Sequence, residues 1–227
     1  MGNEIFLIGE THILEREADI HVSNNREYDW FFPQGYSKNP DINCGPATIK
    51  MAAKWYDEEF SKTIDIIRDE IAIAEGEGIT TGHIKNYLKR IKIDYSVLFN
   101  PLIDEIIENI NKGNIIIGIT NLSYIRRNFG RINRNINMTS LAPGFYEANH
   151  SIIIKGYKKY KIHDKEFVLL EVYEPGIRRK DSSGAYIGED IYYFADDILR
   201  GMDELSSSIH CICNKPKIPF LVIESNK

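Results

Sequence analysis

The sequence changes character at the stretch Asn43-Cys44-Gly45-Pro46-Ala47-Thr48. Residues 1–40 before it look extended and irregular, because an asparagine pair, two prolines and a glycine interrupt them at Asn24-Asn25, Pro33, Gly35 and Pro40. From Pro46 onward, apolar residues recur at the spacing of one helix face, at Ala47, Met51 and Trp55. Pro46 suits the first helical turn, because an N–H there would have no partner within the helix. The stretch therefore predicts a helix that begins directly after Cys44.

Three more helices are expected in the first half of the chain. The first starts at Ser61 as N-cap and stops at Gly76, the second follows Thr80-Thr81, and the third opens at Asn100-Pro101 and closes at Gly113. Their inward faces carry branched aliphatic residues at helical spacing: Ile64, Ile67, Ile71, Ile84, Leu88, Ile91, Ile103, Ile106, Ile107 and Ile110. The first half is therefore expected to be mainly helical.

The second half has the patterns of β-strands. Asn114 to Thr120 is a β-branched run typical of a buried strand, and the polar turn 158–165 joins two apolar runs into a hairpin. The expected strands are 114–120, 151–157, 166–173, 208–213 and 219–224, with a short helix at 195–201. Helices first and strands second predict an α+β fold, in which a helical N-terminal half packs on a mainly antiparallel β-sheet from the C-terminal half.

Composition excludes several classes of protein. The chain has 227 residues, of which 43% are hydrophobic, and this length favours a single domain. Lys and Arg number 28 against 33 Asp and Glu, a net charge of −5, so no basic excess exists to bind nucleic acid. No cofactor-binding motif is found, and His210-Cys211-Ile-Cys213 is expected to be part of a strand and not a metal site, because it lacks a second ligand pair.

The apolar runs and the cysteines bear on location. The N-terminal run Ile5 to Ile8 is too short for a signal peptide, and no run approaches the ~20 residues that span a bilayer. The three cysteines, Cys44, Cys211 and Cys213, are too few for a disulfide framework and suit a reducing compartment. A cytoplasmic location without membrane association is expected, with export by a route that needs no cleavable signal left open.

Cys44 is the residue with the clearest chemical potential. A thiol at a helix N-terminus lies at the positive end of the helix dipole, which stabilises the thiolate and lowers the pKa. Gly45 allows a tight backbone turn and leaves room for a substrate beside the sulfur. The alternative is that Cys44 is only a small buried apolar residue. Its position before a helix favours the nucleophile.

A nucleophilic cysteine needs a base, and His150 stands at the start of the apolar run 151–154. A hairpin turn centred on Ile162 would place Glu174 directly opposite His150. Every second residue after His150 and before Glu174 is apolar, as at Ile152 and Val172. His150 and Glu174 would therefore lie on the core-facing side of adjacent strands, at the strand ends. A carboxylate there would orient the imidazole and stabilise the imidazolium. The alternative is a salt bridge at the hairpin end without a catalytic role.

An ordered set of motifs resembles papain-like cysteine peptidases, and more narrowly the bacteriocin-processing, double-glycine-leader type and its stand-alone relatives. The motifs are Asn-Cys-Gly-Pro-Ala-Thr, Lys-Gly-Asn-Ile-Ile-Ile-Gly-Ile, Asn-His-Ser-Ile-Ile-Ile-Lys-Gly-Tyr and Val-Tyr-Glu-Pro-Gly. The resemblance implies one peptidase domain over 1–227, with a core at 34–176, an N-terminal extension at 1–33 and a C-terminal helix and strands at 177–227.

The resemblance also implies roles for four residues. Cys44 would be the nucleophile, His150 the general base and then acid, and Glu174 the orienting carboxylate. Gln34, the only glutamine in the sequence, would donate its side-chain amide to the oxyanion beside the backbone N–H of Cys44, a contribution of roughly 3–4 kcal/mol. Two features depart from the family pattern: Glu174 replaces the usual Asp, and residues 35–42 look like an insertion between Gln34 and Cys44.

The expected function is therefore a thiol-dependent hydrolase, most simply a cysteine peptidase that acts through a thioester on a peptide or protein. Two alternatives stay open: an acyltransferase or deamidase with the same triad, and a catalytically inactive module that binds a peptide or a partner protein. Substrate contacts are expected from Gly45, Asn149, Arg126 and Arg127. The two arginines belong to the polar segment 121–149, which is either a solvated loop or a lid that selects acidic substrates.

Overall fold

The computed structural model describes residues 17–125, 128–129, 135–136, 149–162, 164–208 and 219–226. The helical segments in these ranges are η2 (Gln34–Tyr36), α2 (Cys44–Tyr56), α3 (Ile64–Ile71), α4 (Thr81–Arg90), α5 (Ile103–Asn111), η3 (Leu122–Tyr124) and α6 (Ala195–Ser208). The strands are β1 (Ile20–Ser23), β2 (Tyr95–Phe99), β3 (Ile115–Asn121), β4 (Asn128–Phe129), β5 (Asn135–Ile136), β6 (Asn149–Ile162), β7 (Lys165–Tyr173), β8 (Ile191–Phe194) and β9 (Pro219–Ile223).

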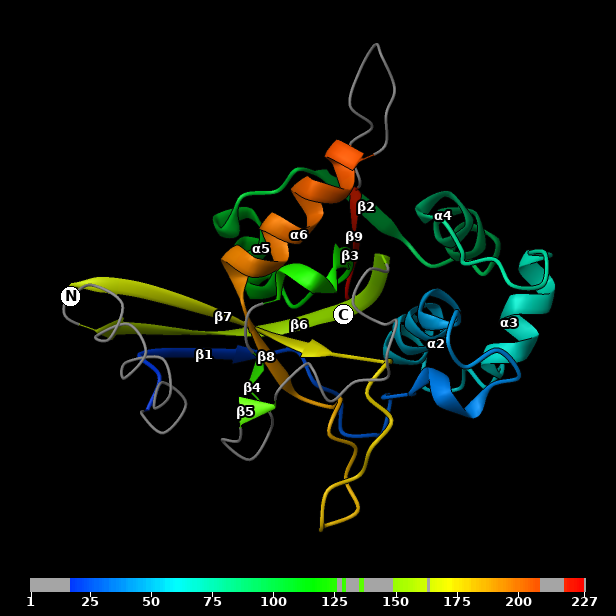
Figure 1. Ribbon diagram of the computed structural model, residues 1–227, viewed down its shortest axis with the longest axis horizontal. Helices are drawn as coiled ribbons and strands as arrows, with labels where there is room; N and C mark the ends of the chain where they lie inside the picture. The colour runs from blue at the N-terminus through cyan, green and yellow to red at the C-terminus, as the bar shows by residue number, and fades with distance from the viewer. Residues whose placement is uncertain are drawn as a thin grey trace.

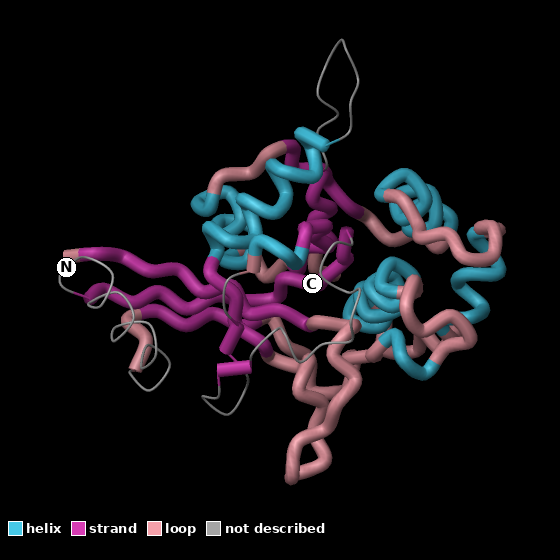
Figure 2. The backbone as a smooth tube through the Cα atoms, in the orientation of Figure 1, coloured by secondary structure: helices cyan, strands magenta, loops and turns pink. Residues whose placement is uncertain are grey.

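The strands of these described ranges form one sheet in the order β2-β9-β3-β6-β7-β8-β4-β5, and β1 pairs with β6 beyond the end of β3. Each pairing between them is antiparallel. Figures 1 and 2 show α5 and α6 together on one side of β3 and β9, with α2, α3 and α4 grouped on the other side. The expected α+β fold with a mainly antiparallel sheet is therefore confirmed.

Each face of the sheet has its own hydrophobic core. Trp55 of α2 and Ile84 of α4 pack with Ile153 and Tyr173 on one face. Ile106 of α5 and Ile198 of α6 pack with Ile152 and Val172 on the other. Because neighbouring residues of β6 point to opposite faces, a single run of isoleucines serves both cores.

Several element boundaries differ from the sequence-based expectation. The first helix begins at Cys44 itself, so the thiol belongs to the first helical turn. The N-cap of α3 is Thr63 and not Ser61, because the Thr63 hydroxyl accepts the Ile66 N–H at 3.2 Å. The helical half also contributes strand β2, which pairs with β9, and α5 packs on the face opposite α2. The expected strand 208–213 lies almost entirely outside the described residues, and its first residue, Ser208, ends α6.

The expected hairpin register is wrong. The β6–β7 hairpin is longer than expected and closes with Ile162 paired to Lys165, so the turn is not centred on Ile162. A β-bulge at Lys155 then shifts the pairing by one residue, from Gly156–Glu171 to Ile154–Val172. The last pair is Ile153–Tyr173, so Glu174 follows beside Ile152 and not directly opposite His150.

The bulge keeps His150 and Glu174 on the same face. Without the extra residue, the register of Gly156 with Glu171 would set Glu174 against Ile153, whose side chain points away from the His150 side. With the bulge, His150, Ile152 and Ile154 share a face with Val172 and Glu174. The expected shared face is therefore correct, although the expected register is not.

Candidate active site

Cys44 occupies the first position of α2, after the N-cap residue Asn43. Asn43 is buried, and its carbonyl accepts the first helical hydrogen bond, from the Ala47 N–H at 3.0 Å. Cys44 as a whole residue is only partly buried. The helix dipole and the unpaired N–H groups of the first turn both favour a negative charge at this position.

A buried arginine fixes the residue before the thiol. Arg68 of α3 donates to the Asn43 side-chain oxygen at 3.0 Å and to the carbonyls of Ala74 and Glu77 at 3.0 and 2.7 Å. The Asn43 amide in turn donates to the Ser37 hydroxyl at 2.8 Å. The sequence reasoning missed Arg68, although its place on the inward stripe of α3, four residues after Ile64, was a signal that the charge is used.

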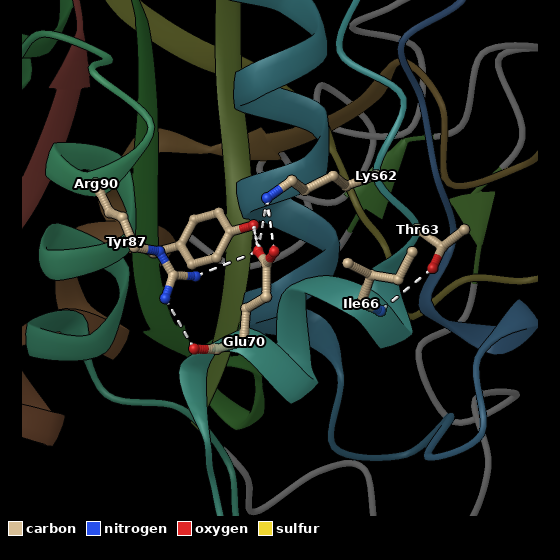
Figure 3. Close-up of polar contacts among 6 residues, drawn as sticks. All are labelled: Lys62, Thr63, Ile66, Glu70, Tyr87 and Arg90. Carbon is tan, nitrogen blue, oxygen red and sulfur yellow. Dashed lines mark hydrogen bonds and ion pairs between the residues drawn. The ribbon is translucent and has the colours of Figure 1, made fainter.

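Glu70 joins α3 to α4, as Figure 3 shows. Its carboxylate accepts from Lys62 at 2.7 Å, from the Tyr87 hydroxyl at 2.6 Å and from Arg90 at 3.3 Å. Arg90 also donates to the Glu70 carbonyl at 2.9 Å. Glu70, Tyr87 and Arg90 line a surface pocket of about 200 Å³, but these three already pair with one another. We therefore assign the pocket to the joint that holds α3, and with it Arg68, in place.

His150 lies between the thiol and a carboxylate. It is buried at the start of β6, where it pairs with Thr120 of β3. Its Nε2 contacts Oε1 of Glu174, and its ring forms a hydrogen bond with the Cys44 side chain. Because Nε2 faces the carboxylate, Nδ1 is the nitrogen left for the sulfur. The Ser151 backbone N–H also donates to Cys44.

The charges of Cys44, His150 and Glu174 shift the pKa values of the thiol and the imidazole. Burial raises the pKa of Cys44, but the charge and hydrogen bond of His150 outweigh it, so the pKa lies below the ordinary thiol value. Burial lowers the pKa of His150, but the charges of Glu174 and Cys44 raise it to about 10. At neutral pH the arrangement therefore favours a thiolate beside an imidazolium.

Two hydroxyl groups tie the helix of Cys44 to the strand of His150. The Thr48 hydroxyl donates to the Gly45 carbonyl at 2.8 Å and lies 2.9 Å from the Ser151 hydroxyl. Since Thr48 has used its only proton, Ser151 is the donor between them. This buried contact joins α2 to β6 close to both functional residues. Thr48 is one helical turn after Cys44, and Ser151 directly follows His150.

Glu174 is fully buried and has three donors. Its Oε1 also accepts from the Gly176 N–H at 2.9 Å, and its Oε2 accepts from the Tyr193 hydroxyl at 3.2 Å. These contacts hold the carboxylate at the imidazole. Tyr193 is a further residue that the sequence reasoning missed.

Gln34 lies in the same region, but one of its amide N–H bonds is already used. Its backbone N–H donates to the Pro175 carbonyl at 2.9 Å, which places η2 beside the residue after Glu174. Its side-chain Nε2 donates to the Pro40 carbonyl at 2.7 Å, within the segment 35–42. Arg178 donates to the same carbonyl at 2.9 Å. Within the part of the chain that the structure describes, the second Nε2 hydrogen of Gln34 has no acceptor.

The expected substrate contacts have different outcomes. Gly45 is buried, and a Cβ there would overlap the Ile79 side chain, so the missing side chain makes room for Ile79, while a substrate contact at Gly45 stays a prediction. Asn149 is exposed at the start of β6 and pairs with Asn121. Arg126 and Arg127 lie outside the described residues, as do His210, Cys211 and Cys213.

In the described ranges, no cluster of His, Cys, Asp and Glu could hold a metal ion. None of the helices described is long and apolar enough to cross a membrane.

Comparison with known proteins finds a similar fold but no similar sequence. No family model matches the sequence, and no curated protein matches it. Among solved structures, a chain from Bacillus anthracis described as a C39-like peptidase superposes with a TM-score of 0.52 at 14% sequence identity. The match covers 92% of this chain and 100% of that chain. The chain therefore has the fold of a C39-like peptidase.

Proposed function

We propose that the chain is a cysteine peptidase-like hydrolase in which Cys44, His150 and Glu174 act as a catalytic triad. One observation carries the proposal: the buried imidazole of His150 is hydrogen-bonded to the thiol on one side and to a buried carboxylate on the other. The peptidase-like fold supports the same class of reaction.

The proposed reaction proceeds through a thioester. The Cys44 thiolate attacks the carbonyl carbon of a peptide bond, and the imidazolium of His150 gives its proton to the departing amine. Neutral His150 then takes a proton from water, which attacks the thioester and releases the acid and the thiol. Glu174 stabilises the imidazolium at both stages and holds the ring in one orientation.

The oxyanion of each tetrahedral intermediate needs hydrogen-bond donors. The backbone N–H of Cys44 lies in the first turn of α2 and has no acceptor within the helix. The second Nε2 hydrogen of Gln34 is the side-chain donor we propose beside it, in keeping with the resemblance to papain-like peptidases. Pro40 would then orient the Gln34 amide through the bond to its other hydrogen.

Thiol reactivity gives the first test. We expect iodoacetamide to alkylate Cys44 at about pH 6 much faster than Cys211 or Cys213, because Cys44 lies beside the imidazolium of His150. The rate should fall to that of an ordinary thiol in His150→Ala. Peptide mapping by mass spectrometry identifies the alkylated residue. Equal, slow reaction of all three thiols would contradict both the peptidase and the transferase and leave the inactive binding module.

A second experiment separates a peptidase from an acyltransferase. The narrower resemblance makes peptides that contain Gly-Gly the first substrates to assay. The acyl-enzyme on Cys44 is trapped at low pH and identified by mass spectrometry, then released by water or by an added amine. Faster release by water supports the peptidase, and faster release by the amine supports the acyltransferase. Cys44→Ser is the control that forms no thioester.

A further inference from the structure

Tyr193 of β8 approaches the candidate triad from a strand that carries none of its three members. It pairs with Leu170 of β7, so its side chain points to the same face as Leu170, Val172 and Glu174. Tyr193 is fully buried there, and its hydroxyl donates to Oε2 of Glu174 at 3.2 Å. The neighbouring Tyr192 points to the opposite face, into a cluster with Tyr160 and Leu169.

The two oxygens of Glu174 have separate partners. Oε1 accepts from His150 and from the Gly176 N–H, whereas Oε2 accepts from the Tyr193 hydroxyl. A glutamate has one more rotatable bond than an aspartate, so its carboxylate needs a second fixed point to present one oxygen to the imidazole. Burial and the Glu174 charge raise the pKa of Tyr193 well above 10, so its hydroxyl stays protonated and able to donate.

We infer that Tyr193 is a positioning residue for the candidate triad, whose hydroxyl fixes Oε2 of Glu174 so that Oε1 faces His150. This inference rests on the proposed function. It explains how a glutamate serves where an aspartate is usual: the hydroxyl of a third strand holds the longer side chain. Without that hydroxyl, the buried Oε2 loses its donor, and the carboxylate is free to turn away from the imidazole.

The test is a double-mutant cycle read by the alkylation rate of Cys44 with iodoacetamide at pH 7. We expect Tyr193→Phe to lower the rate about 3- to 10-fold, since one hydrogen bond to a charged group is lost. Glu174→Gln should lower it further, and the double variant should react at the rate of Glu174→Gln alone, because Tyr193 acts only through Glu174. Tyr192→Phe, which removes a hydroxyl one residue away on the other face, should keep the wild-type rate.

A role in packing alone gives a different result. In that case Tyr193→Phe would lower stability but keep the wild-type alkylation rate, or its effect would add to that of Glu174→Gln, and either outcome overturns the inference. If wild-type Cys44 is itself no faster than an ordinary thiol and His150→Ala has no effect, the proposed function fails, and the inference fails with it. A fast wild type with an unchanged Tyr193→Phe variant overturns the inference alone.

A measurement on the wild-type protein covers the case in which Tyr193→Phe does not fold. Alkylation of Cys44 removes the thiolate beside His150, and the change should pass through Glu174 to the tyrosine that donates to it. We expect the NMR signals of Tyr193 to shift on alkylation and those of Tyr192 to stay in place. Unchanged Tyr193 signals would overturn the inference.

Discussion

Glu174 and His150 form a pair whose charges depend on each other. Burial alone would lower the pKa of His150, yet Glu174 and Cys44 raise it to about 10. The imidazolium is therefore stable up to about that pH, and the thiolate beside it forms below the ordinary thiol range. At a pH between the pKa of Cys44 and that of His150, the thiolate can attack a carbonyl and the imidazolium can protonate a leaving group.

At the scale of the residue, Gly45 tests how tightly the first turn of α2 is packed. An alanine normally stabilises a helix relative to glycine, but here its Cβ would overlap the Ile79 side chain. We predict that Gly45→Ala lowers the free energy of unfolding by about 1–2 kcal/mol, because Ile79 must leave its position. Urea unfolding measures the loss.

Gly78→Ala is the matched control for this prediction. Gly78 is the residue before Ile79, and an added Cβ would meet nothing within 4 Å, so its unfolding free energy should stay within about 0.5 kcal/mol of wild type. The double variant Gly45→Ala/Ile79→Ala should be no less stable than Ile79→Ala alone. A loss from Gly45→Ala that persists in full without the Ile79 side chain would mean that another contact causes it.

The residues that the sequence identified are those with a local signal. Cys44 precedes a helical pattern, and His150 and Glu174 end apolar runs of strands, so their roles could be suggested from neighbours in the chain. Arg68 and Tyr193 act through long-range contacts, to Asn43 and Glu174, and no local pattern reports which distant atom a buried polar group meets. The contact of Gly45 with Ile79 is likewise one between distant parts of the chain, and no local pattern reports it.

At the scale of the element, the bulge of β6 determines which side chains meet. The alternation of apolar residues predicted the shared face of His150 and Glu174, but periodicity alone does not reveal an extra residue in a strand. Lys155 at the bulge is buried, and its ammonium pairs with Glu171 and, at 2.8 Å, with Asp190. These ion pairs hold the side chain of the bulged residue in the interior.

Gly156, next in the chain, lies against β1. A Cβ there would overlap the Val22 carbonyl oxygen and lie 3.0 Å from the Ser23 Cα, and these are backbone atoms that cannot rotate away. We predict that Gly156→Ala separates β1 from β6 and costs about 3 kcal/mol of unfolding free energy, at the upper end of overpacking losses. Urea unfolding measures the cost, and hydrogen exchange at Val22 and Ser23 reports on β1.

Gly118→Ala is the control in a neighbouring strand. Gly118 of β3 is buried as well, but a Cβ there would lie 3.4 Å from the nearest atoms, the Phe220 ring, close to an ordinary contact. Its cost should be about 1 kcal/mol or less. Equal losses in the two variants would refute the tight approach of β1 to the bulge.

At the scale of the whole molecule, the candidate site lies where the two halves of the chain meet. Cys44 comes from the helical half, while His150, Glu174 and Tyr193 come from three regions of the sheet half. The order of helices and strands predicted the α+β fold, because it follows from local periodicity. The placement of α5 opposite α2, and the pairing of β2 with β9, depend on contacts between distant segments and could not be predicted in this way.

The pH titration of the Cys44 thiolate, followed by its ultraviolet absorbance, tests the central claim most directly. The spectrum of Cys44→Ser is subtracted to remove the signals of Cys211, Cys213 and the tyrosines. We predict that Cys44 ionises below the ordinary value of about 8.5. In His150→Ala the burial that raises the pKa of Cys44 remains without its counterweight, so the thiol should then ionise above the ordinary value. A wild-type thiol that titrates at or above about 8.5, or one that titrates alike with and without His150, would contradict the claim that these residues form an activated pair.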